Sequence, residues 1–116
     1  MFIVLAAGFL KSCKNDDPSV IKIFVRSASN ELVEGAKVII IGDVDSNPAT
    51  LPWQDTVITN NSGFASFNVQ AHFDKGDKDY TVGYFDVIAK TTTKTATGYI
   101  RSRVHTTAVE TVYLPN

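Results

Sequence analysis

The chain opens with an apolar run and continues in short segments in which apolar and polar residues alternate. The run, Met1–Leu10, has no charged residue and is shorter than the roughly 20 apolar residues that cross a bilayer. From Val20 onward, apolar residues recur mainly at every second position, which is typical of strands with one buried face. We find no segment after the run with helical spacing and caps. The pattern therefore predicts an all-β domain.

About seven strands are expected, separated by turn residues. The unbroken aliphatic stretch Lys37–Ile41 is typical of a strand covered on both faces, so we place it centrally. Asn60–Gly63 is a strong hairpin signal, because Asn and Gly tolerate positive φ. Seven short strands imply two sheets that bury their apolar faces against each other. The expected strands are 20–25, 37–41, 56–59, 64–69, 84–90, one within 91–103, and 109–114.

Four segments carry a family resemblance. Leu32–Ile40 reads LVEGAKVII and resembles the V-x-G-A-x-V-x-V segment of the carboxypeptidase regulatory-like and transthyretin-like β-sandwich families. Thr59–Phe67 reads TNNSGFASF and resembles their T-[DN]-x-x-G-x-A-x-F hairpin. With Tyr84–Ala89 and Val109–Leu114, the resemblance covers nearly all of 20–114. It implies a single Ig-like or transthyretin-like sandwich over residues 20–116, and it is almost silent on function, because related modules serve as spacers, adhesion units and accessory subunits.

The single cysteine, Cys13, follows the apolar run closely. Leu10–Cys13 reads LKSC and resembles the lipobox of bacterial lipoproteins, from which Lys11 departs. The run also has the length of the apolar core of a secretory signal, about 7–15 residues. The resemblance implies a signal peptide over 1–12, a lipidated Cys13 and a polar tether over 13–19.

The residues after the cysteine bear on localisation. Cys13–Asp17 resembles the short acidic tag that routes some lipoproteins to the outside of the outer membrane. The resemblance implies a lipid-anchored outer-membrane protein on the cell-surface side. Two other interpretations stay open: Cys13 could be a buried thiol, or Met1–Leu10 could be an apolar strand. The polar flanks of Cys13, ended by Pro18, favour lipidation, and a single cysteine excludes a disulfide framework.

The charges are nearly balanced, with 11 Lys and Arg against 12 Asp and Glu. Nucleic-acid binding rests on clustered Lys and Arg, so nucleic acid is not an expected partner. His72 and His105 lie in different segments, and neither stands in a nucleophile motif. Ser62 precedes Gly63 in what fits a hairpin turn rather than the elbow of a hydrolase. We therefore expect no enzyme, and structural or surface roles for both histidines.

One polar loop places three carboxylates close together. Asp74, Asp77 and Asp79 fall within six residues and are weak candidates for calcium ligands. Lys75 and Lys78 are interleaved with them and would repel a cation. Two distant histidines and one cysteine likewise do not make a zinc set. We expect a solvated loop, with no metal and no cofactor, and weak calcium binding as the alternative.

A long loop, Gly42–Gln54, contains the only tryptophan, Trp53. Long loops on rigid sandwiches are common places for binding. Leu51 could pack beside Trp53 while two prolines restrict the loop, so Leu51 and Trp53 are candidate partner contacts. A buried Trp53 would instead be a lid over one end of the sandwich, and an exposed one could stack on a sugar ring.

Two function classes remain. The first is a non-catalytic accessory or structural lipoprotein that is held at the membrane and binds a protein partner in a larger cell-envelope complex. Its long loop and its threonine-rich strands would form the contact surface. The second is a small carbohydrate- or surface-binding module. A single domain with one tryptophan favours the first class.

Overall fold

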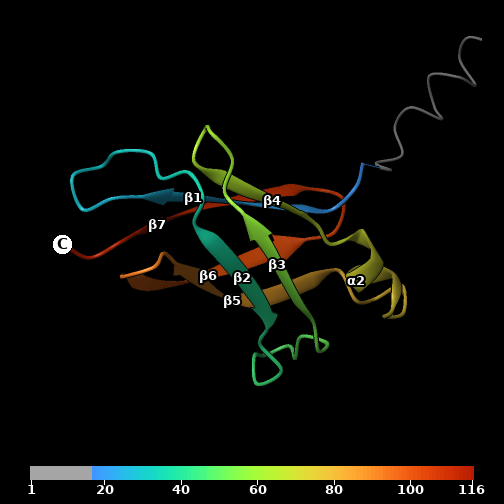
Figure 1. Ribbon diagram of the computed structural model, residues 1–116. Coiled ribbons are helices and arrows are strands. Elements are labelled where there is room, and N and C mark those ends of the chain that lie inside the picture. Colours follow the sequence, from blue (N-terminus) through green and yellow to red (C-terminus); the bar gives the residue numbers. More distant parts are fainter. Residues whose placement is uncertain (1–16) are drawn as a thin grey trace, which may run out of the picture.

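The computed structural model describes residues 17–116, so the predicted signal peptide and Cys13 lie outside the described residues. Seven strands in two layers confirm the predicted all-β sandwich (Figure 1). The strands are β1 (Val20–Arg26), β2 (Lys37–Gly42), β3 (Gln54–Ile58), β4 (Phe64–Asn68), β5 (Val82–Lys90), β6 (Thr95–Arg103) and β7 (Thr107–Tyr113). Among residues 17–116, no helix is long and apolar enough to cross a membrane.

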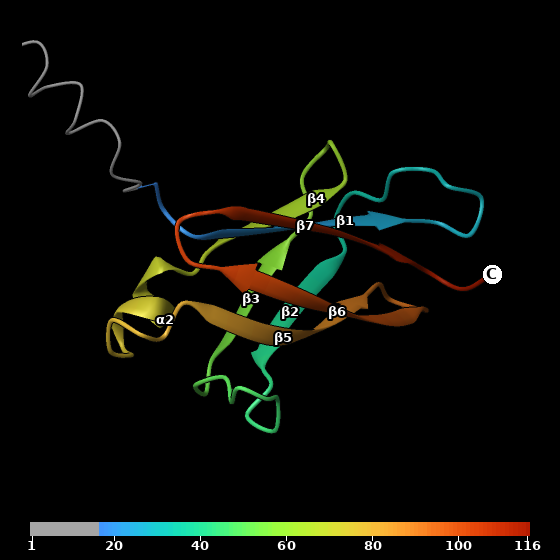
Figure 2. The same ribbon diagram turned by 180° about the vertical axis from the view of Figure 1, so that it is seen from behind.

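The strands form a three-stranded sheet in the order β4-β1-β7 and a four-stranded sheet in the order β3-β2-β5-β6. β1 runs antiparallel to β4 and parallel to β7. All neighbours in the four-stranded sheet are antiparallel. The β1–β2, β3–β4, β4–β5 and β6–β7 connections each carry the chain from one sheet to the other (Figure 2). The hairpin predicted at Asn60–Gly63 is therefore wrong: the turn joins β3 to β4, which pair with β2 and β1 rather than with each other. β2 lies between β3 and β5, so the central position expected for its aliphatic run is confirmed.

The core lies between the sheets and is filled by alternate residues of each strand. Ile21, Ile23 and Val25 of β1 are completely buried, as are Val38 and Ile40 of β2. This is the period-2 burial that the sequence predicts. Each such side chain contributes about 1.5–3 kcal/mol when it is removed from water. The other buried apolar residues are Ala36, Ala65, Phe67, Val69, Phe73, Phe85, Val87, Ala89, Ile100, Val112 and Leu114.

Two glycines adopt left-handed backbone conformations at turns. Gly63 has φ +79° and ends the Asn60–Gly63 turn between β3 and β4, where its N–H donates to the Asn60 carbonyl oxygen. Gly35 has φ +82° just before β2. Both torsions lie where a Cβ is unfavourable. A Cβ on Gly63 would also come within 3.0 Å of Leu32, whereas one on Gly35 would contact nothing within 4 Å.

One short helix, α2 (Gln70–Asp74), follows β4 and was not expected from the sequence. It is a single turn, too short to show helical periodicity. The Asn68 side-chain oxygen accepts the N–H of Gln70 at its start. The turn buries His72 and Phe73 at one end of the sandwich.

The domain also begins earlier than the expected residue 20. Ser19, the last residue of the polar tether expected over 13–19, is completely buried. Its carbonyl accepts the N–H of Val69, and its N–H and hydroxyl both donate to the side-chain oxygen of Gln70. The hydroxyl also accepts the N–H of His105. These hydrogen bonds attach the start of the described chain to the α2 end (Figure 1).

Candidate functional site

A buried histidine forms the centre of an aromatic cluster at the α2 end. The ring of His72 lies 5.0–5.4 Å, between centroids, from the rings of Trp53, Phe73, Tyr80 and Phe85. Its Nε2 is 2.6 Å from the hydroxyl oxygen of Tyr80. Within residues 17–116, its Nδ1 has no hydrogen-bond partner. The imidazole is therefore packed as part of the core.

The surroundings of this cluster suppress charge on both polar rings. Burial, followed by the nearby positive charge of Lys75, lowers the pKa of His72 to about 4. Burial also raises the pKa of Tyr80. Both side chains are therefore neutral near pH 7, and His72 lacks the second ring proton that an imidazolium would donate as an acid. The expectation of a structural or surface role agrees with this placement.

The predicted contact residues Leu51 and Trp53 lie against this cluster. Trp53 is half-buried and packs on the core, and the Lys75 ammonium lies 5.3 Å above its ring. Leu51 is also half-buried, and its N–H donates to the Tyr80 hydroxyl. Trp53 thus takes the position of the lid rather than that of an open stacking platform. One side of Trp53 still lines a shallow groove of about 660 Å³ that Val44 and Pro52 share.

The long loop is held in place by hydrogen bonds that the sequence does not reveal. Thr50 is 2% exposed, and its hydroxyl accepts the N–H of Tyr84. At the start of the loop, the N–H of Asp43 donates to the carbonyl of Tyr84. The carboxylate of Asp43 accepts the hydroxyl of Tyr99 at 2.6 Å, which raises the pKa of Tyr99 to about 12. The loop is therefore a fixed part of the domain surface.

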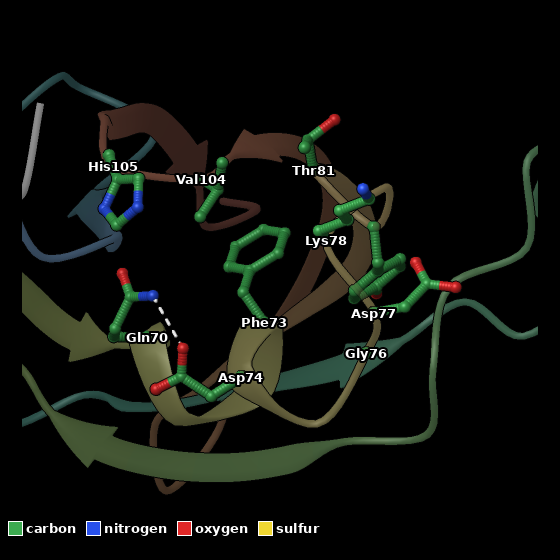
Figure 3. Close-up of a pocket in the computed structure, with 10 residues that line it drawn as sticks. Gln70, Phe73, Asp74, Gly76, Asp77, Lys78, Thr81, Val104 and His105 are labelled. Carbon is green, nitrogen blue, oxygen red and sulfur yellow. Dashed lines mark hydrogen bonds between the residues drawn. The ribbon is translucent and has the colours of Figure 1, made fainter. Parts of the chain in front are cut away.

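Two of the three calcium candidates line a second hollow, of about 420 Å³, next to α2 (Figure 3). Asp74 and Asp77 line it, while Asp79 does not. Asp74 accepts a hydrogen bond from the side-chain amide of Gln70, and Asp77 accepts the N–H of Asp79. Among the described residues, no group of three or more His, Cys, Asp or Glu side chains is placed to hold a metal ion. The structure therefore does not assemble the three aspartates into a calcium site.

His105 borders the same hollow (Figure 3). It has φ +63° in the turn between β6 and β7. Its Nδ1 lies 2.6 Å from the carbonyl oxygen of Asp17. A carbonyl only accepts, so Nδ1 is the donor. The hydroxyl of Ser19 meets the backbone N–H of His105 and not its ring, so these residues do not form a nucleophile and base pair.

The outer face of the four-stranded sheet carries an aliphatic and aromatic surface. The residues that point outward on it alternate with the buried ones. Ile39 pairs with Ile88 across β2 and β5, and Tyr84 stacks on Tyr99 with ring centroids 6.1 Å apart. We name this surface the outer stripe; its members are Ile39, Ile41, Ile58, Tyr84, Ile88 and Tyr99.

The outer stripe corrects one expectation for β2. The sequence predicts cover on both faces of this strand, but Ile39 and Ile41 are only half-buried on the outer side. Ile58 and Tyr99 are 52% and 46% exposed. Ile41 also lines the groove beside Trp53, so the stripe continues into the long loop. A contiguous exposed apolar surface of this kind marks interaction sites more often than isolated exposed residues do.

The outer face is also positively charged. The outward positions of its strands hold four cations and one carboxylate, and Asp43 of the long loop adds a second carboxylate at the hydroxyl of Tyr99, whereas the whole chain has a net charge of −1. The cations are Lys37, Lys90, Arg101 and Arg103, and the carboxylate on the strands is Asp86. Sequence alternation alone assigns these residues to one side of their strands. They share one face of the sheet only because of the strand order, which could not be predicted from the sequence.

Comparisons with known proteins address the fold. No family model and no curated protein matches the sequence. Among solved structures, the Bacillus anthracis TIE protein is similar, with a TM-score of 0.55 and 15% identity. The match covers 86% of this chain and 17% of that chain, so this chain spans about a sixth of that protein's length. At this identity, the likeness shows a shared β-sandwich fold.

Proposed function

We propose that the protein is a non-catalytic lipoprotein of the outer membrane that binds a protein partner through the outer face of its four-stranded sheet. It would act there as an accessory or structural subunit of a larger cell-envelope complex. The observation that carries this proposal is the outer stripe. Aromatic and aliphatic side chains that share an open face are typical of the centre of a protein interface.

The position of the described N-terminus fits an anchored domain. Asp17–Ser19 emerges at the α2 end, and the C-terminus lies at the opposite end in both views (Figures 1 and 2). If Cys13 is lipidated, the four residues from it to Asp17 span at most about 14 Å. The α2 end would then face the membrane, and the sheets would stand upright with the outer stripe accessible from the side.

The placement of Trp53 supports the sheet face over the loop as the main contact. The indole ring of Trp53 packs against the ring of His72, and the ammonium group of Lys75 lies over it. A residue in this position contributes to the stability of the domain. Val44, which is half-exposed on the loop, remains available at the end of the stripe. The sugar-stacking alternative gains nothing from a tryptophan that is partly covered by a lysine.

Co-purification in mild detergent from native membranes tests the proposal. The full chain should retain a stoichiometric protein partner. Ile58→Ser with Tyr99→Ser should weaken that association about tenfold, because exposed anchors of this kind are worth about 1–2 kcal/mol together. The matched control is Val109→Ser with Tyr113→Ser, whose side chains are 55% and 57% exposed on the other sheet; it should leave the association unchanged.

Two results would contradict the proposal. One is equal partner retention by both double variants. The other is purification of the protein alone together with its retention on a polysaccharide column, which would support the carbohydrate-binding class. The anchor is tested separately: Cys13→Ala should release an unacylated protein from the membrane fraction, and an unacylated native protein would overturn the localisation.

A further inference from the structure

We infer that the partner is acidic and that it places a carboxylate between Lys37 and Lys90 at one end of the outer stripe. This inference rests on the proposed function and names the chemistry of the partner. Lys37 and Lys90 are direct cross-strand partners on β2 and β5. Both side chains are exposed and point to the outer face.

A like-charged pair at this register position disfavours the free protein. Directly opposite residues in antiparallel strands have Cβ atoms about 4.5–5.5 Å apart, and like charges there are destabilising. The neighbouring positions in the same row are Ile58 on β3 and Thr95 on β6. Neither can neutralise the two ammonium groups. A carboxylate supplied by a partner would form favourable interactions with both.

The two lysines line a cleft suited to such a group. The cleft has a volume of about 300 Å³, and its other lining residues are Gly35, Ile58, Thr91 and Thr92. None of these residues is acidic. Gly35 has no side chain, and the space beside its Cα is open, since a Cβ there would contact nothing within 4 Å. Ile58 gives the cleft an apolar side that is continuous with the outer stripe.

The charged residues on the rest of the outer face also favour an acidic partner. Arg101 and Arg103 lie on the outer side of β6, so cations lie at both ends of the face. Asp86, which is paired with Ile41 and Tyr99, places one carboxylate between them, where a partner's apolar residues rather than its carboxylates would lie. An acidic polypeptide segment with aliphatic side chains would match this arrangement, with its apolar residues on the stripe and its carboxylates at the ends. The cleft lies at the far end of β5 from α2, roughly 27 Å along the strand. In the upright orientation it faces away from the membrane.

Neutralising the two lysines tests the inference. Lys37→Gln with Lys90→Gln should weaken the association with the co-purified partner at least tenfold in a binding titration, and raising the salt concentration should weaken binding to the native protein. The thermal midpoint of the free double variant should stay the same or rise, since a repulsion is removed. Lys22→Gln with Lys78→Gln removes the same net charge from the other sheet and the α2 end, and it should leave the affinity unchanged.

The outcomes separate this inference from the proposed function. If Ile58→Ser with Tyr99→Ser weakens binding but the Lys37 and Lys90 variant binds within twofold of the native protein, the acidic partner is refuted and the binding face stands. If both lysine variants lose affinity equally, the effect is one of net charge and the site is refuted. Binding of the lysine pair to phosphatidylglycerol vesicles in place of the partner would also overturn the inference.

Discussion

The buried imidazole of His72 should make the domain sensitive to mild acid. Its pKa is lowered from 6.5 to about 4 in the folded protein, while the unfolded chain keeps the ordinary value. At pH values between these two pKa values, the unfolded state binds a proton that the folded state does not, so the free energy of unfolding falls as the pH falls. The loss should be about 2 kcal/mol at pH 5 and about 3 kcal/mol at pH 4, relative to pH 8.

Urea unfolding at a series of pH values measures this loss. The single Trp53 lies next to His72, so its fluorescence reports unfolding of this end of the domain. The matched variant is His72→Phe, which keeps an aromatic ring in the cluster and cannot titrate. Its free energy of unfolding should change by less than about 1 kcal/mol between pH 8 and pH 5. Equal pH dependence in the two proteins would refute the assignment of His72 as a neutral core residue.

Three further predictions concern stability and are measured by urea unfolding followed by circular dichroism. Trp53→Ala should lower the free energy of unfolding by about 2 kcal/mol, because the ring packs on the core. An unchanged free energy would contradict the role of Trp53 as a lid over one end of the sandwich. Gly63→Ala should cost more than Gly35→Ala, for which about 1 kcal/mol is expected from backbone strain alone, since only the first adds a clash with Leu32. Equal costs would show that Leu32 gives way. Thr59→Val should cost about 1–3 kcal/mol, because its buried hydroxyl bonds one backbone N–H and one backbone carbonyl; a cost near zero would mean that these groups find other partners.

The sequence predicted the strands well because strand burial is local. Burial alternates with period 2 in every strand but β7, and turn residues such as those of Asn60–Gly63 mark strand ends. The short helix α2 was missed because a single turn carries no period. The burial of Ser19 was missed for another reason: its partners, Gln70 and His105, are 51 and 86 residues away along the chain.

The candidate site was predictable only in part. The composition of the long loop singled out Leu51 and Trp53, but whether Trp53 is exposed depends on His72 and Lys75, which belong to a different segment. The outer stripe was hidden by the unbroken aliphatic run of β2. Such a run is typical of a strand buried on both faces, and here it is half-buried on one of them. Only the strand order brings Ile39 beside Ile88 and Lys37 beside Lys90.

The most direct test of the account is a lysine acetylation footprint of the complex isolated with its partner. Mass spectrometry would compare the acetylation rate of each lysine in the complex and in the free protein. The account predicts that Lys37 and Lys90 react at least fivefold more slowly in the complex, while Lys22 and Lys78 react at unchanged rates. Protection of Lys22 or Lys78, with Lys37 and Lys90 as reactive as in the free protein, would contradict binding through the outer face of the four-stranded sheet.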